Sequence, residues 1–157
     1  MAASRVWLTH PLAVLGWSAL ATGAVALALQ PLFNDGNRFW LYAYFLPIAA
    51  PFAAFCLDRL ARLRAIDWRQ WALELPLLAL ALARATQPIP LISGHAMFLA
   101  YALLTVRSAT GRWLALLVYL SVVYMKIAEI RDPVTLIGGS LAGFAAGWWV
   151  RRAFPPE

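Results

Sequence analysis

Hydrophobic residues follow one another in six long runs along this chain, and short polar segments separate them. A helix that crosses a bilayer needs about 20 mostly apolar residues. The pattern therefore predicts an all-α bundle of six transmembrane helices. The predicted spans are Pro11–Leu32, Phe39–Leu57, Gln70–Ala85, Ile89–Val106, Trp113–Ile130 and Val134–Val150. The third run is the weakest candidate, because it is short and carries Glu74 and Pro76 near its start.

The separating segments have the composition of turns and membrane interfaces. Asn34–Arg38 reads NDGNR, which is a turn cluster. Asp58–Gln70 is charged and partly amphipathic, which predicts a connector lying at the interface. Arg107–Arg112 predicts a short polar hairpin, and Arg131–Pro133 is expected to end the fifth helix. The whole chain is thus expected to be one transmembrane domain, 1–157.

Composition supports a lipid environment. Of the 157 residues, 63% are hydrophobic and 13% are charged, whereas soluble domains are about half apolar and a quarter charged. A chain this short cannot hide such a surplus in one core. The first run resembles a signal peptide in part, but its length favours a retained first helix.

The arginines predict the orientation. With a cytoplasmic N-terminus, the inner side receives most of the basic residues, namely Arg5, Arg59, Arg62, Arg64, Arg69, Arg107, Arg112, Arg151 and Arg152. The outer side receives Arg38, Arg84, Lys126 and Arg131. Cytoplasmic loops carry the basic excess, so both termini are predicted to be cytoplasmic, in a bacterial inner membrane. These flanking arginines also explain the net charge of +6 without nucleic acid as a partner.

Six ionisable residues are predicted to approach the outer face together: Arg84, His95, Lys126, Glu129, Arg131 and Asp132. Ionisable groups at a bilayer edge tend to pair and to mark function. Lys126 and Glu129 share a helix face, either as an ion pair that ends the helix or as a cation that tunes a neighbour. His95 alone would more often be satisfied by backbone carbonyls.

Together, the basic side chains among these six residues favour binding of a phosphate ester or pyrophosphate. Ser93 and Gly94 precede His95 at a helix start, where backbone amides and the helix dipole favour an anion. We assign no cofactor and no metal ligands, and the single cysteine, Cys56, excludes an intrachain disulfide. Gly139, Gly143 and Gly147, spaced by four, predict close helix packing within the chain or against a second copy in a homo-oligomer.

Ser93-Gly94-His95 at the start of the fourth of six spans resembles the second motif of the type-2 phosphatidic acid phosphatase (PAP2) superfamily. Arg131–Gly143, RDPVTLIGGSLAG, is similar to the third motif through Pro133 and the glycine-bearing helix. The resemblance implies that His95 donates a proton to the leaving alcohol. Arg131 stands where the family has its nucleophilic histidine, and Thr135 where it has the orienting aspartate.

Three alternative functions are consistent with these sequence features. The first is a hydrolase or phosphotransferase acting on a membrane lipid or isoprenoid phosphate at the outer leaflet. In it His95 is the general acid, Glu129 or Asp132 the general base on water, and the anion is clamped by Arg84, Lys126 and Arg131 with Ser93 and Gly94. The second is a non-catalytic protein that binds an anionic lipid or assists a partner enzyme. The third is a structural or transport subunit whose polar residues only finish helices.

Overall fold

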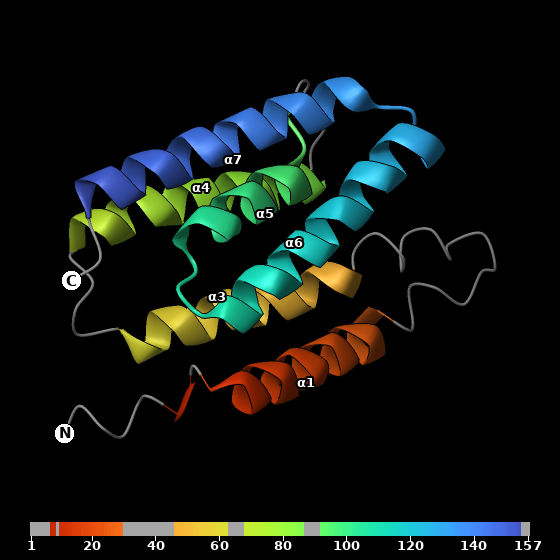
Figure 1. Ribbon diagram of the computed structural model, residues 1–157. Coiled ribbons are helices and arrows are strands. Elements are labelled where there is room, and N and C mark those ends of the chain that lie inside the picture. Colours follow the sequence, from red (N-terminus) through yellow and green to blue (C-terminus); the bar gives the residue numbers. More distant parts are fainter. Residues whose placement is uncertain (1–6, 9, 30–45, 63–67, 87–91, 155–157) are drawn as a thin grey trace.

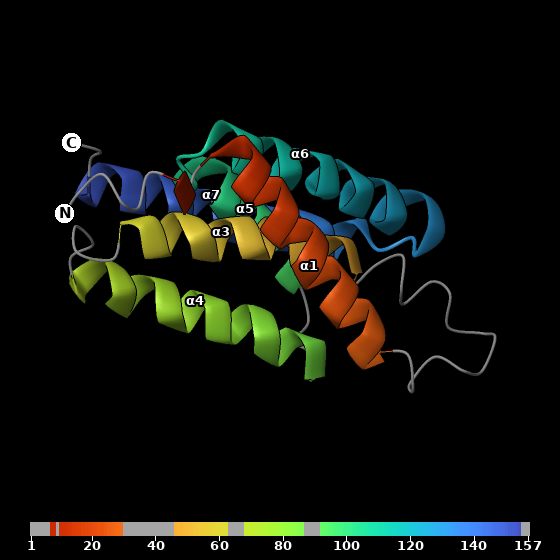
Figure 2. The same ribbon diagram turned by 90° about the horizontal axis from the view of Figure 1, so that it is seen from below.

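The computed structural model describes residues 7–8, 10–29, 46–62, 68–86 and 92–154, with the side chains of 81–86 left out, and within these ranges every regular element is helical. The helices in chain order are α1 (Pro11–Leu29), η3 (Leu46–Ile48), α3 (Ala49–Ala61), α4 (Trp68–Thr86), α5 (Gly94–Thr105), α6 (Ala109–Tyr124), η4 (Met125–Glu129) and α7 (Pro133–Ala153). Figures 1 and 2 show them as a bundle around α5, with α1 on the outside. The all-helical prediction is confirmed.

Three helices are long and apolar enough to cross a membrane: Pro11–Ala28, Ala109–Glu129 and Pro133–Ala153. Their large apolar side chains point outward, including Leu20, Leu117 and Leu141, each more than half exposed. Such a continuous apolar exterior is unusual for a soluble monomer and suits contact with lipid. The chain is therefore compatible with a membrane protein.

Local caps set where the last three helices begin. The Ser93 hydroxyl accepts a hydrogen bond from the Ala96 amide, so α5 starts at Gly94 rather than at the predicted Ile89. Ser108 accepts from the Gly111 amide at 3.1 Å, and α6 starts at Ala109 inside the predicted polar hairpin. Asp132 caps α7 with Pro133 in the first turn, where proline's missing amide costs nothing.

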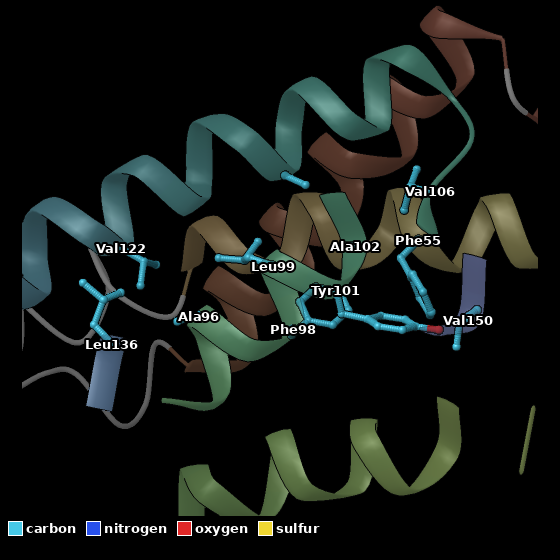
Figure 3. Close-up of a cluster of buried hydrophobic side chains, with 11 residues drawn as sticks. Phe55, Ala96, Phe98, Leu99, Tyr101, Ala102, Val106, Val122, Leu136 and Val150 are labelled. Atoms are coloured by element: carbon cyan, nitrogen blue, oxygen red, sulfur yellow. The ribbon is translucent and has the colours of Figure 1, made fainter. Parts of the chain in front are cut away.

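Helix α5 is the centre of the core. Its residues from Ala96 to Ala102 are all buried, and a helix that is apolar all round belongs in an interior. Figure 3 shows Phe98 and Tyr101 beside Phe55 of α3, with the Phe55 and Phe98 ring centroids 5.6 Å apart. With 12 residues, α5 is about 18 Å long at 1.5 Å per residue. It is shorter than the hydrocarbon layer is thick.

The glycines of α7 face α5 in the same chain. A Cβ on Gly139 would meet the Ser93 backbone, one on Gly143 the Met97 backbone, and one on Gly147 the Leu104 side chain. Helices α5 and α7 therefore run side by side in the same direction at close range (Figure 1). The three glycines therefore serve a contact within the chain. Helix α5 covers the α7 face that the sequence predicted could pack against a second copy.

Charged residues from the predicted interfacial connector belong instead to the interior. Asp58 and Arg59 continue α3 and are buried, and Gln70 and Glu74 are buried on α4. The connector interpretation of Asp58, Arg59 and Gln70 is therefore corrected. The physical reason is that Arg59 pairs with Asp58 and with Glu74, and Gln70 donates a hydrogen bond to Glu74, as described below.

Candidate functional site

Lys126 anchors a polar cluster where α6 ends and α7 begins. The last turn of α6 widens into the π-helical turn η4, and the Lys126 side chain is buried there. Its ammonium donates to Asp132 Oδ2 at 2.8 Å and to Thr135 Oγ1 at 3.0 Å. The Asp132 carboxylate also accepts from the Thr135 amide and hydroxyl. One carboxylate thus caps α7 and neutralises Lys126.

The turn between the two helices is shaped by the backbone. The Asp132 amide donates to the Lys126 carbonyl at 2.8 Å, and Arg131 has a φ of 55°. A non-glycine residue in this left-handed region is uncommon and carries some strain. The strained turn brings Asp132 back over Lys126, which straight α-helical spacing does not do.

His95 joins this cluster from the first turn of α5. It is half-buried. The Ser93 amide donates to the Thr135 carbonyl at 2.9 Å, which ties the start of α5 to the start of α7. The structure therefore brings together Ser93, Gly94, His95, Lys126 and Asp132 at one end of the bundle, which we call the His95 rim.

The remaining predicted site residues stand apart. Glu129 and Arg131 are both exposed, and the carboxylate that the structure sets on Lys126 is that of Asp132. The π-helical turn explains this, because it disrupts the three-residue spacing on which the Lys126–Glu129 pairing depended. Arg84 lies in the last turn of α4, and its side chain falls outside the described part.

The pH dependence of stability tests the Lys126–Asp132 pair. The hydrogen bonds from Lys126 and Thr135 lower the pKa of Asp132 from 3.8 to about 2. Because the folded pKa is depressed, the stabilisation is complete above the unfolded value and is lost as pH falls toward the folded one. Asp132→Asn keeps a good capping side chain but removes the charge. We expect it to lose about 1–2 kcal/mol at neutral pH.

That loss should shrink as the pH falls from about 4 to about 2. Unfolding of the detergent-solubilised protein, followed by circular dichroism at several pH values, measures it. Glu129→Gln removes an exposed carboxylate and is the control. A deficit in Asp132→Asn that stayed constant down to pH 2 would contradict the assigned pair.

A second ionic cluster, which the sequence interpretation missed, lies at the opposite end of α5. Arg59 donates to both oxygens of Glu74, with Nη2 2.8 Å from Oε1 and Nε 3.0 Å from Oε2. Glu74 Oε1 also accepts from Tyr101 at 2.6 Å and from Gln70 at 2.7 Å. Glu74 has an exposed fraction of 0% and Arg59 of 2%. The desolvation cost of burying these charges is offset because each is paired and hydrogen-bonded.

Asp58 extends this cluster toward the α5–α6 turn. Its carboxylate pairs with Arg59 Nη1 at 2.7 Å and with Arg62, and it accepts from the Arg107 amide at 3.0 Å. The signal that could have revealed the cluster is the presence of Asp58, Arg59 and Glu74 beside apolar runs, since such charges need partners. What spacing does not reveal is which partners meet.

The two ends of the bundle thus differ in character. At the His95 rim an imidazole, an ammonium and a carboxylate meet, and these groups transfer protons and contact anions. At the other end the buried charges of Asp58, Arg59 and Glu74 pair with one another and tie α3, α4 and α5 together. Among the described residues, no three His, Cys, Asp or Glu side chains gather to hold a metal ion. Comparison of the chain with protein-family models, with curated proteins and with solved structures finds no match.

Proposed function

We propose that this chain is an integral membrane protein that acts on the phosphate group of a lipid or isoprenoid phosphate at the His95 rim. The observation that carries the proposal is that Thr135, on α7, joins two segments of the site. Its carbonyl accepts from the Ser93 amide, two residues before His95, and its hydroxyl accepts from Lys126, on η4. An ammonium attracts a phosphate as a point charge, and an imidazole transfers a proton to or from a reacting group.

The chemistry that follows is hydrolysis of a phosphate ester. Water attacks phosphorus, the bond from phosphorus to the ester oxygen breaks, and the imidazolium form of His95 gives its proton to the departing oxygen. The negative charge of the bound phosphate favours that protonated form by offsetting the charge of Lys126. The proton of the attacking water passes to solvent. The Gly94 amide, in the first turn of α5, stabilises the negatively charged phosphate oxygens.

A second candidate is binding of an anionic lipid without turnover. It is favoured by the state of Asp132, whose carboxylate already accepts from Lys126 and Thr135 and caps α7. A carboxylate held in this way is a poor base for water. Arg131 and Thr135 also stand at the positions where the PAP2 resemblance expects a nucleophilic histidine and its aspartate.

We further propose six spans with both termini cytoplasmic, in a bacterial inner membrane. The arginine asymmetry of the sequence supports this orientation. The gathering of Arg62, Arg107, Arg112 and Arg151 around one cavity, at the end of α5 away from His95, is consistent with it. In this arrangement the His95 rim faces the outer leaflet.

Substitution of His95 tests the function. Purified protein in detergent micelles is given phosphatidic acid or a polyisoprenyl diphosphate, and released inorganic phosphate is measured. If His95 transfers the proton, His95→Gln should lower turnover by about 10²- to 10⁴-fold. The unfolding midpoint of the variant, measured alongside, separates lost chemistry from lost folding.

His10→Gln is the matched control, because His10 directly precedes α1 and lies outside the His95 rim. Turnover that His95→Gln leaves intact would refute the proton-transfer role. Absence of phosphate release by the wild type, together with phosphatidic acid binding that Lys126→Gln abolishes, would establish the second candidate instead.

A further inference from the structure

A cavity lined by arginines opens at the end of the bundle opposite the His95 rim. Its volume is about 170 Å³. Its polar lining comes from Arg62, Gln70, Thr105, Arg107, Arg112 and Arg151, with aliphatic side chains and Phe154 completing it. Among the described residues, the lining includes four guanidinium-bearing side chains and no carboxylate.

Each arginine reaches the cavity from a different element. Arg62 ends α3, Arg107 follows α5, Arg112 is in the first turn of α6, and Arg151 is in the last turn of α7. Four guanidinium-bearing side chains from four segments therefore converge on one cavity, an arrangement suited to an anion.

The nearby carboxylates are already engaged. Asp58 accepts from Arg59, from Arg62 and from the Arg107 backbone amide. Glu74 accepts from Arg59, Gln70 and Tyr101. Neither carboxylate belongs to the cavity lining.

We propose that this cavity binds a phosphate or pyrophosphate group, either as a lipid headgroup or as a free phosphate compound. Guanidinium groups bind phosphate oxygens in pairs, through parallel N–H donors. The volume corresponds to about five or six water molecules at roughly 30 Å³ each. That is room for a headgroup-sized anion. The proposal does not depend on the proposed function of the His95 rim.

Binding measurements on the full chain in detergent micelles test this site. One arm uses inorganic phosphate and pyrophosphate as probes. The other uses micelles containing phosphatidic acid, against micelles containing phosphatidylcholine. Binding in the first arm identifies a free phosphate compound, and binding in the second alone identifies a headgroup. Because charged hydrogen bonds contribute about 1.5–3 kcal/mol each, we expect the Arg112→Gln/Arg151→Gln double variant to raise Kd at least about tenfold.

Arg152→Gln is the matched control. Arg152 is exposed beside Arg151 on α7, and its guanidinium stacks on Trp148 at 4.2 Å, outside the cavity lining. The proposal is overturned if the wild type binds neither probe at millimolar concentration. It is equally overturned if Arg152→Gln weakens binding as much as the double variant does. Since Arg112 and Arg151 are both exposed, their replacement should leave the unfolding midpoint unchanged.

Discussion

Gly143→Ala should destabilise the bundle by about 3 kcal/mol or more, because the added methyl has no space. Its Cβ would overlap the Met97 carbonyl oxygen and lie 2.9 Å from the Ala100 Cβ. Both obstacles belong to α5, where Met97 and Ala100 are almost completely buried. A backbone oxygen cannot swing away as the tip of a long side chain can. Helices α5 and α7 would therefore have to separate, which exposes the core around Phe98 and Tyr101.

The measurement is unfolding of the detergent-solubilised protein by heat or by SDS, followed through circular dichroism. Gly16→Ala is the matched control, because nothing lies within 4 Å of a Cβ at Gly16 on α1. Alanine has the better helix propensity, so this control should be neutral or slightly stabilising. Equal midpoints for the two variants would show that α5 and α7 do not approach as closely as described.

Arg59→Met should cost about 3–5 kcal/mol, the range seen when one partner of a buried ion pair is removed. Arg59 donates to both oxygens of Glu74 and to Asp58. Its loss would leave Glu74 fully buried with only Gln70 and Tyr101 as donors. The loss also removes the cation–π contact with Phe55, whose ring centroid lies 4.4 Å from the guanidinium carbon.

A double-mutant cycle separates the pair from its surroundings. Arg59→Met/Glu74→Met removes both charges, so it should be more stable than Arg59→Met alone. Arg69→Met, on the exposed start of α4, is the control and should change stability by less than about 0.5 kcal/mol. If Arg59→Met matched this control, the buried network would have no role in holding α3, α4 and α5 together.

Helix positions were largely predictable, because they follow from local chemistry. The uninterrupted apolar runs predicted the helices that became α1, α6 with η4, and α7. Where the bounds differ, a capping side chain is responsible. Ser93 stops α5 from extending back to Ile89, and Ser108 starts α6 four residues before Trp113. The apolar runs continue past these serines, so hydropathy alone does not show where the caps begin the helices.

The candidate site was predictable only in part. Ser93, Gly94, His95 and Lys126 could be assigned to one end of the bundle by counting spans, and the structure brings them together. The partner of Lys126 could not be assigned, because it depends on the π-helical turn and on the left-handed conformation of Arg131. Regular helical spacing pointed to Glu129, three residues away, and the folded turn presents Asp132 instead.

By itself, the sequence determined that this chain is all-helical over its described residues and compatible with lipid, since hydropathy and capping act over a few neighbouring residues. Only the tertiary structure decided which charges meet. Arg59 finds Glu74 across 15 residues, and Arg62 shares a cavity with Arg151 from the far end of the chain. Coulomb attraction and hydrogen bonding act over a few ångströms of space. The partner of a charge is therefore set by helix packing, which no local pattern records.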